Sequence, residues 1–196
     1  MIHKLAVNQF YKQQNKILLT TIFLVPLISS SVALPVRAIT FNVRHNIKTL
    51  NTNHTVYQVA QVPKVQRLPA NGVVKRYWNS KSQTILAPLN IYTRGTQHYF
   101  IKVVDSKSNK SAMTVFIHAN KNAAIKLPIG TYKIKYATGK QWYGVKDLFG
   151  VNTAYNQVEK QLVFDVQGDK VRGYSLYLYP QVNGNLKTTP INRQQF

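Results

Sequence analysis

The carboxylates are the first side chains to consider for catalysis, and there are only five of them in 196 residues. Asp147 and Glu159 bracket the segment after Trp142, and a pair of carboxylates is the arrangement with which glycosidases cleave a glycosidic bond. Nothing in the sequence fixes the separation of these two side chains. Asp105 and Asp169 lie in predicted turns, where aspartate commonly hydrogen-bonds the backbone. The carboxylates therefore give only a weak case for a glycan hydrolase.

Histidine is the other residue type that supplies acid-base chemistry or binds metals. His98 and His118 lie in predicted strands and could approach each other across a sheet, with Asp105 as a third ligand. A hydrogen-bonded or exposed histidine is the commoner situation, and no spacing typical of a metal site occurs. The chain has no cysteine, and nucleophile-elbow and phosphate-loop patterns are missing. We therefore expect no cofactor and no metal, and the sequence favours a non-enzymatic protein without excluding an enzyme.

An aromatic segment lies between residues 136 and 155. Four large rings are interleaved there with three glycines, a pattern typical of an irregular, closely packed loop. The rings are Trp142, Tyr143, Phe149 and Tyr155. If exposed, they would form a stacking platform for sugar rings, peptide or bases. If buried, they would plug the open end of the fold, which is the interpretation that we favour.

Lysines form the second candidate binding surface. Several of them occupy outward-facing positions of predicted strands, and Lys121, Lys140 and Lys146 flank these strands in loops. The outward lysines are Lys102, Lys126, Lys133 and Lys135. Lysine without many arginines suits diffuse attraction of anions better than bidentate recognition of phosphate. A solvated face without a ligand is an equally good interpretation.

The whole chain is strongly basic, with 26 Lys and Arg against five Asp and Glu and a formal charge of +21. Residues 1–38 hold four of the basic residues and no acid, which leaves 22 basic and five acidic residues, or +17, on the remainder. Such a field favours anionic partners, among them wall polymers, a membrane surface and nucleic acid, and salt should weaken their binding. A solubility adaptation with no dedicated ligand is the alternative.

The N-terminus has the pattern of a secretory signal. Three lysines and no acid precede about twelve mainly apolar residues, Ile17–Ile28, and small residues follow at the spacing of a signal-peptidase site. We predict a signal peptide over residues 1–33, with a second candidate cut after Ala38. An uncleaved anchor and a buried helix are the alternatives, although a membrane span needs about 20 apolar residues. The predicted location is extracytoplasmic, periplasmic or secreted, or membrane-anchored if the signal is retained.

Alternation of apolar and polar residues with period two dominates from about Gly72 onward, with turn residues between short runs. In Thr131–Ala137 and His98–Val104 this alternation predicts one face in the core and one face in water. Residues 34–71 lack a sustained period, so we predict a flexible arm there, with an optional edge strand at Val56–Val65. Residues 146–161 are expected to hold a short helix or a structured loop.

The eight predicted strands are Val73–Trp78, Leu89–Thr93, His98–Asp105, Met113–Ala119, Ala123–Leu127, Thr131–Ala137, Gln161–Val166 and Arg172–Tyr179. This pattern predicts an all-β domain over residues 72–196, a single small antiparallel β-sandwich or partly open barrel.

Two stretches resemble known proteins. Residues 113–139, with the turn Pro128-Ile-Gly-Thr-Tyr132, resemble β-sandwich modules of the carboxypeptidase-regulatory or prealbumin-like type, which implies the same fold class. Residues 68–196, which include Leu148-Phe149-Gly150, are similar to a family of small exported bacterial proteins. That likeness implies a bacterial source and an intact domain, but it carries no activity and no site residues.

These features favour a non-enzymatic extracytoplasmic binding or accessory protein that engages an anionic envelope component or a protein partner. One alternative is an envelope glycan hydrolase that uses Asp147 and Glu159. Another is a structural subunit of a surface assembly, whose arm, residues 39–71, adds to the sheet edge of a neighbour. Export argues against nucleic acid as a partner.

Overall fold

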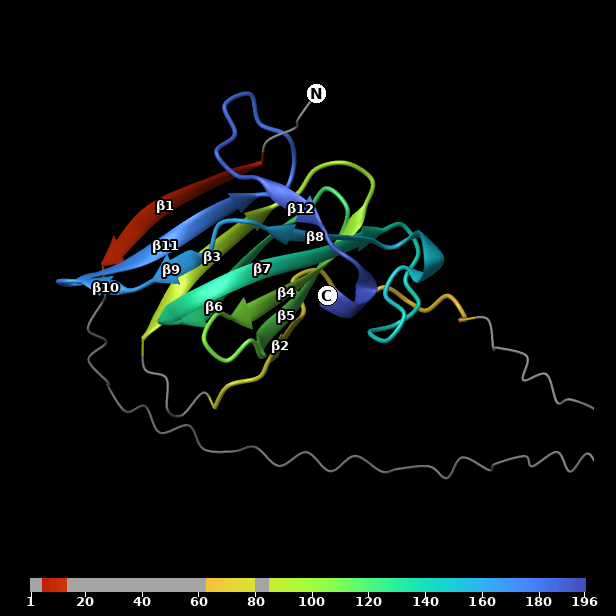
Figure 1. Cartoon of the computed structure of the whole chain (residues 1–196), viewed down its shortest axis with the longest axis horizontal. Coiled ribbons are helices and arrows are strands. Elements are labelled where there is room, and N and C mark those ends of the chain that lie inside the picture. Colours follow the sequence, from red (N-terminus) through yellow and green to blue (C-terminus); the bar gives the residue numbers. More distant parts are fainter. Residues whose placement is uncertain (1–4, 14–62, 80–84) are drawn as a thin grey trace, which may run out of the picture. The chain divides into compact units, whose positions relative to one another are not determined.

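Two β-sheets pack against each other without closing into a barrel (Figure 1). The computed structural model describes residues 5–13, 63–79 and 85–196, and all of these belong to one compact unit. The all-β sandwich predicted from the sequence is therefore confirmed. The apolar run of the predicted signal, both candidate cleavage positions and the arm up to residue 62 lie outside the described residues.

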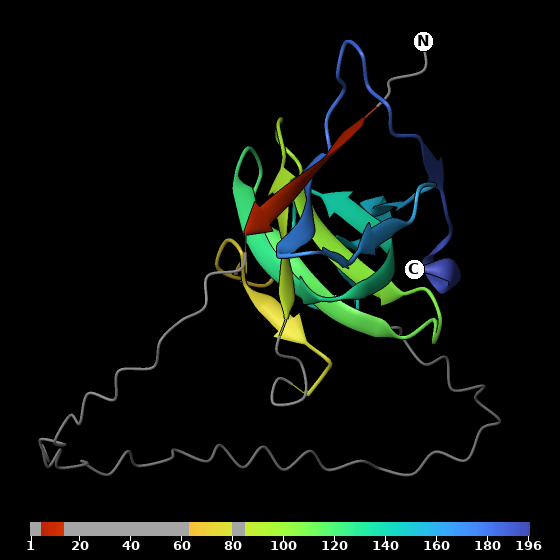
Figure 2. The same cartoon turned by 90° about the vertical axis from the view of Figure 1, so that its left-hand side faces the viewer.

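The first sheet has the strand order β1, β11, β3, β6. These strands are β1 (Ala6–Gln13), β3 (Leu86–Tyr92), β6 (Asn122–Pro128) and β11 (Lys170–Tyr177), and the short β10 (Val166–Gln167) also pairs with β11. The β3–β11 pair is parallel, whereas the neighbours on either side are antiparallel. In Figure 2, β1 (red) runs along the outside of β11 as the edge strand.

The second sheet has the order β12, β8, β7, β4, β5, β2, and β9 also pairs with β7. Its strands are β2 (Val74–Arg76), β4 (His98–Asp105), β5 (Ser111–Ile117), β7 (Gly130–Gly139), β8 (Ala154–Val158), β9 (Leu162–Phe164) and β12 (Thr188–Pro190). Every pair in this sheet is antiparallel. The register places Lys102 of β4 opposite Lys135 of β7, so outward-facing residues of the two longest central strands meet on one face.

The main core lies between the two sheets. Tyr99, Ile101 and Val103 of β4 and Tyr132 and Ile134 of β7 are all buried in it, as the alternation predicts. Burying one such aliphatic side chain contributes about 1.5–3 kcal/mol relative to leaving it in water. Side chains from both sheets belong to this one cluster, so the sheets are held together mainly by apolar packing.

The predicted strands agree with the observed ones to within a few residues, and β4 matches at both ends. The predicted strand Gln161–Val166 is divided into β9 and β10 at Asp165, whose carboxylate lies 3.0 Å from Arg172 Nε. Residues 146–161 contain a loop, the short 3-10 helix η1 (Gly150–Asn152) and the unpredicted β8. β1 and β12 were not predicted either, and β1 lies within the segment interpreted as a signal peptide.

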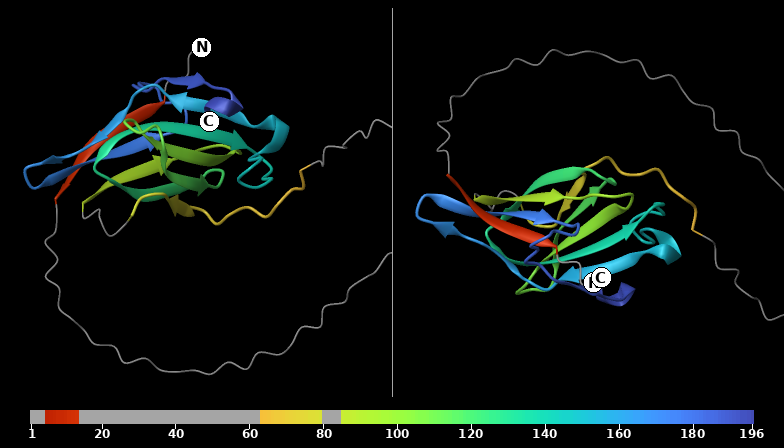
Figure 3. Two further views of the ribbon diagram at one scale, coloured as in Figure 1. Left: turned by 60° about the horizontal axis from the view of Figure 1, so that its bottom comes forward. Right: turned by 90° about the horizontal axis from the view of Figure 1, so that it is seen from above.

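Two chain segments cover the outer face of the second sheet on the side shown at the right of Figure 3, left panel. One is residues 63–72 and the other is the loop 140–153, and Gln66 joins them by donating its N–H to the Trp142 carbonyl at 2.7 Å. A second 3-10 helix, η2 (Arg193–Gln195), follows β12. Within the part of the chain that the structure describes, no helix has the length and apolarity to cross a membrane.

Candidate functional site

A second apolar cluster covers the face of the second sheet that is turned away from the first. Its buried members come from β4, β5, β7 and the loop that follows β7. They are Phe100, Phe116, Ala137, Trp142, Leu148 and Phe149. The ring centroids of Phe116 and Trp142 are 5.0 Å apart, and those of Trp142 and Phe149 are 5.4 Å apart. The prediction of a wet outer face is therefore wrong here, because the large rings of β4 and β5 attract a cover that excludes water.

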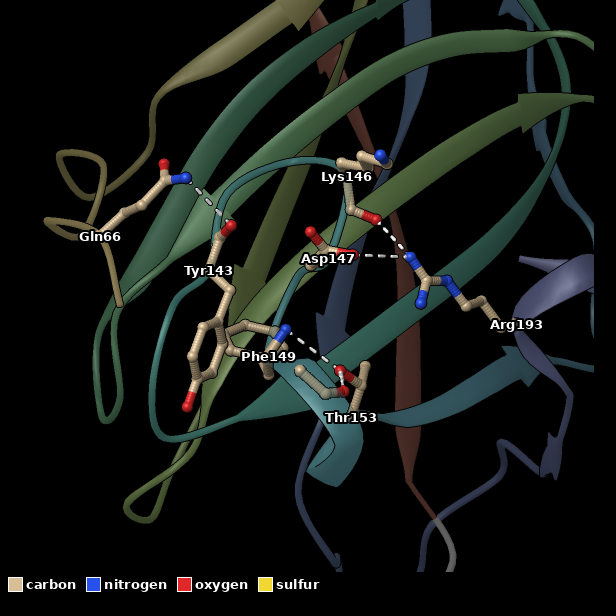
Figure 4. A network of polar contacts seen from close by, with 8 residues as sticks. Gln66, Tyr143, Lys146, Asp147, Phe149, Thr153 and Arg193 are labelled. Carbon is tan, nitrogen blue, oxygen red and sulfur yellow. Dashed lines mark hydrogen bonds and ion pairs between the residues drawn. The ribbon is translucent and has the colours of Figure 1, made fainter. Parts of the chain in front are cut away.

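The loop 140–153 is shaped by its own hydrogen bonds (Figure 4). The Tyr143 N–H donates to the Leu148 carbonyl, and the Leu148 N–H donates to the Gly144 carbonyl, both at 2.7 Å. The Phe149 N–H donates to Thr153 Oγ1 at 3.1 Å, which fastens the end of the loop to the residue before β8. Leu148 has a φ of 49°, an uncommon value for a non-glycine residue. These bonds hold the rings of the loop against the sheet.

The C-terminal segment forms the opposite wall of this region. Asn192 caps η2 by accepting a hydrogen bond from the Gln195 N–H, and the Gln195 side chain accepts one from the Asn192 N–H. Arg193 Nη2 donates to the Lys146 carbonyl at 2.7 Å and to Asp147 Oδ1 at 3.1 Å, as Figure 4 shows. The C-terminal segment and the aromatic loop are thus joined through one guanidinium group.

Two lysines on the sheet also hold this segment. Lys102 Nζ donates to the Phe196 backbone oxygen at 2.6 Å and lies 4.5 Å from the centroid of the Phe196 ring. Lys135 Nζ donates to the Gln195 carbonyl. Burial, and then the neighbouring charge of Lys135, lowers the pKa of Lys102, while burial and then Lys133 lower the pKa of Lys135. A bound anion would compensate the crowded positive charge and would therefore favour the charged form of both lysines.

A pocket of about 330 Å³ opens between the loop, the sheet and the C-terminal segment. Its lining combines aromatic rings, hydroxyl groups and three cations: Tyr77, Phe100, Lys102, Ser111, Thr114, Val145, Lys146, Leu148, Tyr155, Arg193 and Phe196. None of these residues is acidic. The volume lies at the small end of the range of about 300–1,000 Å³ that ligand pockets occupy. The pocket is therefore suited to a compact anionic group that carries a ring or another apolar part.

The structure brings together three of the four outward lysines predicted from the sequence. Lys102, Lys133 and Lys135 share the outer face of β4 and β7. Lys126 does not join them, because it lies on β6 of the first sheet, opposite Pro88. Alternation along each strand predicts which side chains point outward, but it does not say which strands are neighbours.

The four rings predicted as a binding platform have different surroundings. Trp142 and Phe149 are only 3% and 2% exposed, so their rings pack against the sheet and are not open to a surface ligand. Tyr143 is half-buried, and its hydroxyl donates to Gln141 Oε1 at 2.8 Å. Tyr155 lines the pocket. The favoured plug interpretation agrees with the burial of Trp142 and Phe149, but Tyr143 and Tyr155 are half-buried, and the buried rings cover a sheet face and not an end of the sandwich.

Among the lining residues that sequence reasoning missed are Tyr77, Arg193 and Phe196. Tyr77 follows the short β2 at the edge of the sheet, and the other two lie in the C-terminal segment. One sequence signal was available, because Asn192 followed three residues later by Gln195 is a capping-box pattern that marks a helical turn. That pattern predicts the turn but not its position over β4 and β7.

The two carboxylates considered for hydrolysis have separate partners. Asp147 is paired with Arg193, whereas Glu159 follows β8 and accepts a hydrogen bond from Thr189 Oγ1 at 2.9 Å. Each carboxylate is therefore accounted for by a structural bond of its own.

The two strand histidines do lie side by side, with ring centroids 5.5 Å apart. His98 Nδ1 accepts the Ala119 N–H at 3.0 Å, and His118 Nε2 lies 2.6 Å from the Pro69 carbonyl oxygen. Burial, and then the proximity of His118, lowers the pKa of His98. Among residues 5–13, 63–79 and 85–196, no three side chains are grouped as metal ligands. His118 thus ties residues 63–72 to the sheet, and His98 holds the chain that follows β5.

Comparison of the chain with protein-family models, with curated proteins and with solved structures gives no match.

Proposed function

We propose that this protein is a non-enzymatic, extracytoplasmic binding module that takes an anionic sugar unit of an envelope polymer into the pocket beside Lys102. The observation that supports this function most directly is the lining of that pocket, in which three cations and several aromatic rings occur together without an acid. Rings provide apolar faces on which a sugar can stack, and cations attract its carboxylate or phosphate.

The electrostatics of the region favour an anion over a neutral ligand. Lys102 and Lys135 crowd each other across the β4–β7 pair, and the pKa of each is lowered. Their present partners are the Phe196 backbone oxygen and the Gln195 carbonyl. Lys146 extends positive charge to the rim, where Arg193 is also exposed and is paired with Asp147. An incoming carboxylate or phosphate would therefore meet cations from three different chain segments.

Extracytoplasmic location is part of the proposal and rests on the sequence of residues 1–33. N-terminal sequencing of the protein recovered from the cell envelope or medium tests it. A chain that begins at Leu34 or Ile39 supports the location. A chain from the cytoplasm that still begins at Met1 counts against it.

Binding is tested by isothermal titration with three oligosaccharide probes of equal length: one built of uronic acids, one bearing phosphates and one neutral. We expect one or both anionic probes to bind and the neutral probe to bind much more weakly. The relative affinity of the first two identifies the anion. Equal binding of all three probes, or no binding of any, would remove the proposed function.

The site is located with a pair of charge-removing variants. Lys146→Gln removes an exposed cation from the pocket rim, and Lys126→Gln removes an exposed cation from the first sheet. We expect Lys146→Gln to weaken the anionic probe by about two- to fivefold, the effect of one partly screened charge, and Lys126→Gln to leave it unchanged. Equal losses in both variants would mean that the attraction is diffuse and does not come from the pocket.

A further inference from the structure

The edge of the first sheet is built as a receptor for an extended strand. β1 pairs with β11 over eight residues, from Ala6 opposite Tyr177 to Gln13 opposite Lys170. Such backbone pairing recognises an extended chain largely independently of its side chains. Among the strands that the structure describes, β1 has β11 on one side and none on the other, so it is the outermost strand of this sheet (Figures 1 and 2).

The loop that follows β11 holds the N-terminal end of β1. The Asn185 side chain accepts the Val7 N–H at 2.9 Å and donates to the Val7 carbonyl at 3.0 Å. The Leu5 and Leu186 backbones exchange a second pair of bonds, at 2.9 and 2.8 Å. We call the β11 edge together with Asn185 and Leu186 the strand groove.

The strand groove also selects side chains. Leu5 and Val7 are 7% and 4% exposed and belong to the main core. Phe10 lies on the opposite face, over Gly173, where an added Cβ would come within 2.7 Å of the Phe10 ring. The strand groove therefore accepts two aliphatic side chains two residues apart and an aromatic ring three residues further on.

The residues of β1 belong to the positively charged part of the predicted signal peptide. In secretion that part stays on the cytoplasmic side or is removed with the signal, while the chain after the cleavage site crosses the membrane. An exported domain therefore lacks β1, and its β11 edge and the sites of Leu5 and Val7 are left open. A bare edge with apolar sites is a template for strand addition.

We propose that, in the exported protein, the strand groove binds an extended segment of a partner polypeptide with the pattern aliphatic-x-aliphatic-x-x-aromatic. β1 occupies the groove in the unprocessed chain and shows the chemistry of the ligand. This inference rests on the export proposed above, but it concerns a different surface from the anion pocket. N-terminal sequencing tests export, and the assay below tests the groove with purified protein, so the two failures are distinguishable.

The assay frees β1 after the full chain has folded. A protease recognition sequence is placed between Gln13 and Leu34, the folded chain is cut, and the released strand is removed by dialysis. A fluorescent peptide of residues 5–13, LAVNQFYKQ, is then added and its anisotropy is followed. We expect the cut chain to bind the peptide and the uncut chain to exclude it, because tethered β1 competes at a millimolar-scale effective concentration.

Two loop variants test the contacts. Asn185→Ala removes both bonds to Val7, and we expect it to weaken peptide binding on the order of tenfold. Asn183→Ala changes an exposed asparagine of the same loop and should bind like the parent. A peptide with Phe10→Ala should also bind more weakly, because it lacks the ring that covers Gly173.

If native mass spectrometry shows that the cut strand is retained through dialysis, this supports the proposal as directly as uptake of the labelled peptide does. If loss of the strand unfolds the body, recovery of its circular dichroism on adding peptide supports it too. A chain that loses the strand and takes up no peptide overturns the proposal. Pairing of two cut chains in place of peptide uptake, or equal affinity of both asparagine variants, overturns it as well.

Discussion

Gly139, the last residue of β7, illustrates how a missing side chain shapes the site. A Cβ at this position would lie 2.2 Å from Phe149 Cβ and 2.5 Å from its Cγ, so the aromatic loop can rest on β7 only where the sheet has no side chain. Phe149 in turn packs against Trp142. A single glycine therefore allows the second core to form.

We expect Gly139→Ala to lower the free energy of unfolding by about 1–3 kcal/mol, the usual cost of overpacking a well-packed core. The variant should also shift the emission of Trp142 to longer wavelength as the loop is pushed off the sheet. The measurement is urea denaturation together with fluorescence in a Trp78→Phe background, which leaves Trp142 as the only tryptophan.

Gly95→Ala is the control, because a Cβ there has no neighbour within 4 Å but the φ of 93° strains an alanine. It should cost a similar free energy, about 1–2 kcal/mol, without changing the Trp142 emission. A Gly139→Ala variant with unaltered emission would contradict the proposed seating of Phe149.

His98 gives a pH dependence whose sign follows from its environment. Burial and the nearby His118 lower the pKa of His98 in the folded state, so the unfolded chain binds the proton more readily. The contribution of neutral His98 to stability should be fully present above the unfolded pKa of about 6.5, and it should be lost as the pH decreases below that value. Urea midpoints at pH 7.5 and pH 5 measure this difference.

His98→Asn isolates the effect, because its Oδ1 can still accept the Ala119 N–H while the ring no longer titrates. We expect the loss of stability between pH 7.5 and pH 5 to be smaller in this variant than in the parent. An identical loss in both proteins would assign the pH dependence to other groups.

At the scale of elements, periodicity predicted the strands that have one face in the main core. β4 and β7 alternate strictly on that face, which is why their positions could be read from the sequence. β8 could not be predicted in this way, because four of its five residues are half-buried or exposed and its pattern has no apolar side. β12 has only three residues and ends in Pro190. Such short strands at the sheet edge or next to it are fixed by their neighbours more than by their own composition.

The candidate site was only partly predictable for a related reason. The outward direction of Lys102 and Lys135 follows from local alternation, but their position opposite each other is seen only in the structure. Arg193 and Phe196 reach the site through contacts with residues 46 and 94 positions away along the chain. Local periodicity carries no information about such contacts. β1 was missed because its one lysine, Lys12, and its short apolar stretches also fit the start of a signal peptide.

The aromatic loop depends on one hydroxyl group for its attachment to β8. Thr153 Oγ1 accepts the Phe149 N–H and donates to the Gly150 carbonyl at 2.7 Å. Thr153→Val leaves the buried Phe149 N–H without this partner, which costs about 1–3 kcal/mol. We expect the Trp142 emission to shift to longer wavelength and amide exchange to accelerate in residues 140–152.

Thr189→Val serves as the matched control, since its hydroxyl bonds Glu159 at an exposed position of β12. This variant should leave both the emission and the exchange of the loop unchanged. Equal loop exchange in the parent and in Thr153→Val would show that the packed rings hold the loop without the hydroxyl.

At the scale of the whole molecule, the positions of the few acids decide which positive charges are compensated. Asp147 and Asp165 pair with arginines, and Asp105 accepts hydrogen bonds within its own turn, from the Ser108 N–H at 2.7 Å among others. Asp105 and Asp165 therefore reinforce a turn and a strand end locally, whereas Asp147 joins the aromatic loop to the C-terminal segment. Most of the positive charge remains uncompensated, so the protein as a whole carries a field that attracts anions and is screened by salt.

We expect three buried tyrosines of the main core to make the protein less stable at alkaline pH. Burial, and then the charge of Asp105, raises the pKa of Tyr132 to about 12, and burial also raises the pKa values of Tyr99 and Tyr136. Since an unfolded tyrosine has a pKa of about 10, the stabilisation is complete below pH 10 and is lost as the pH rises toward 12. We expect the urea midpoint to fall over this interval.

The variant Tyr132→Phe tests this expectation. Its free energy of unfolding should be about 1 kcal/mol lower at pH 8, because the Tyr132 hydroxyl donates to the Pro128 carbonyl at 3.1 Å. Its urea midpoint should fall less steeply between pH 10 and 12 than that of the parent. A decline as steep as that of the parent would mean that deprotonation of Tyr132 does not contribute to alkaline unfolding.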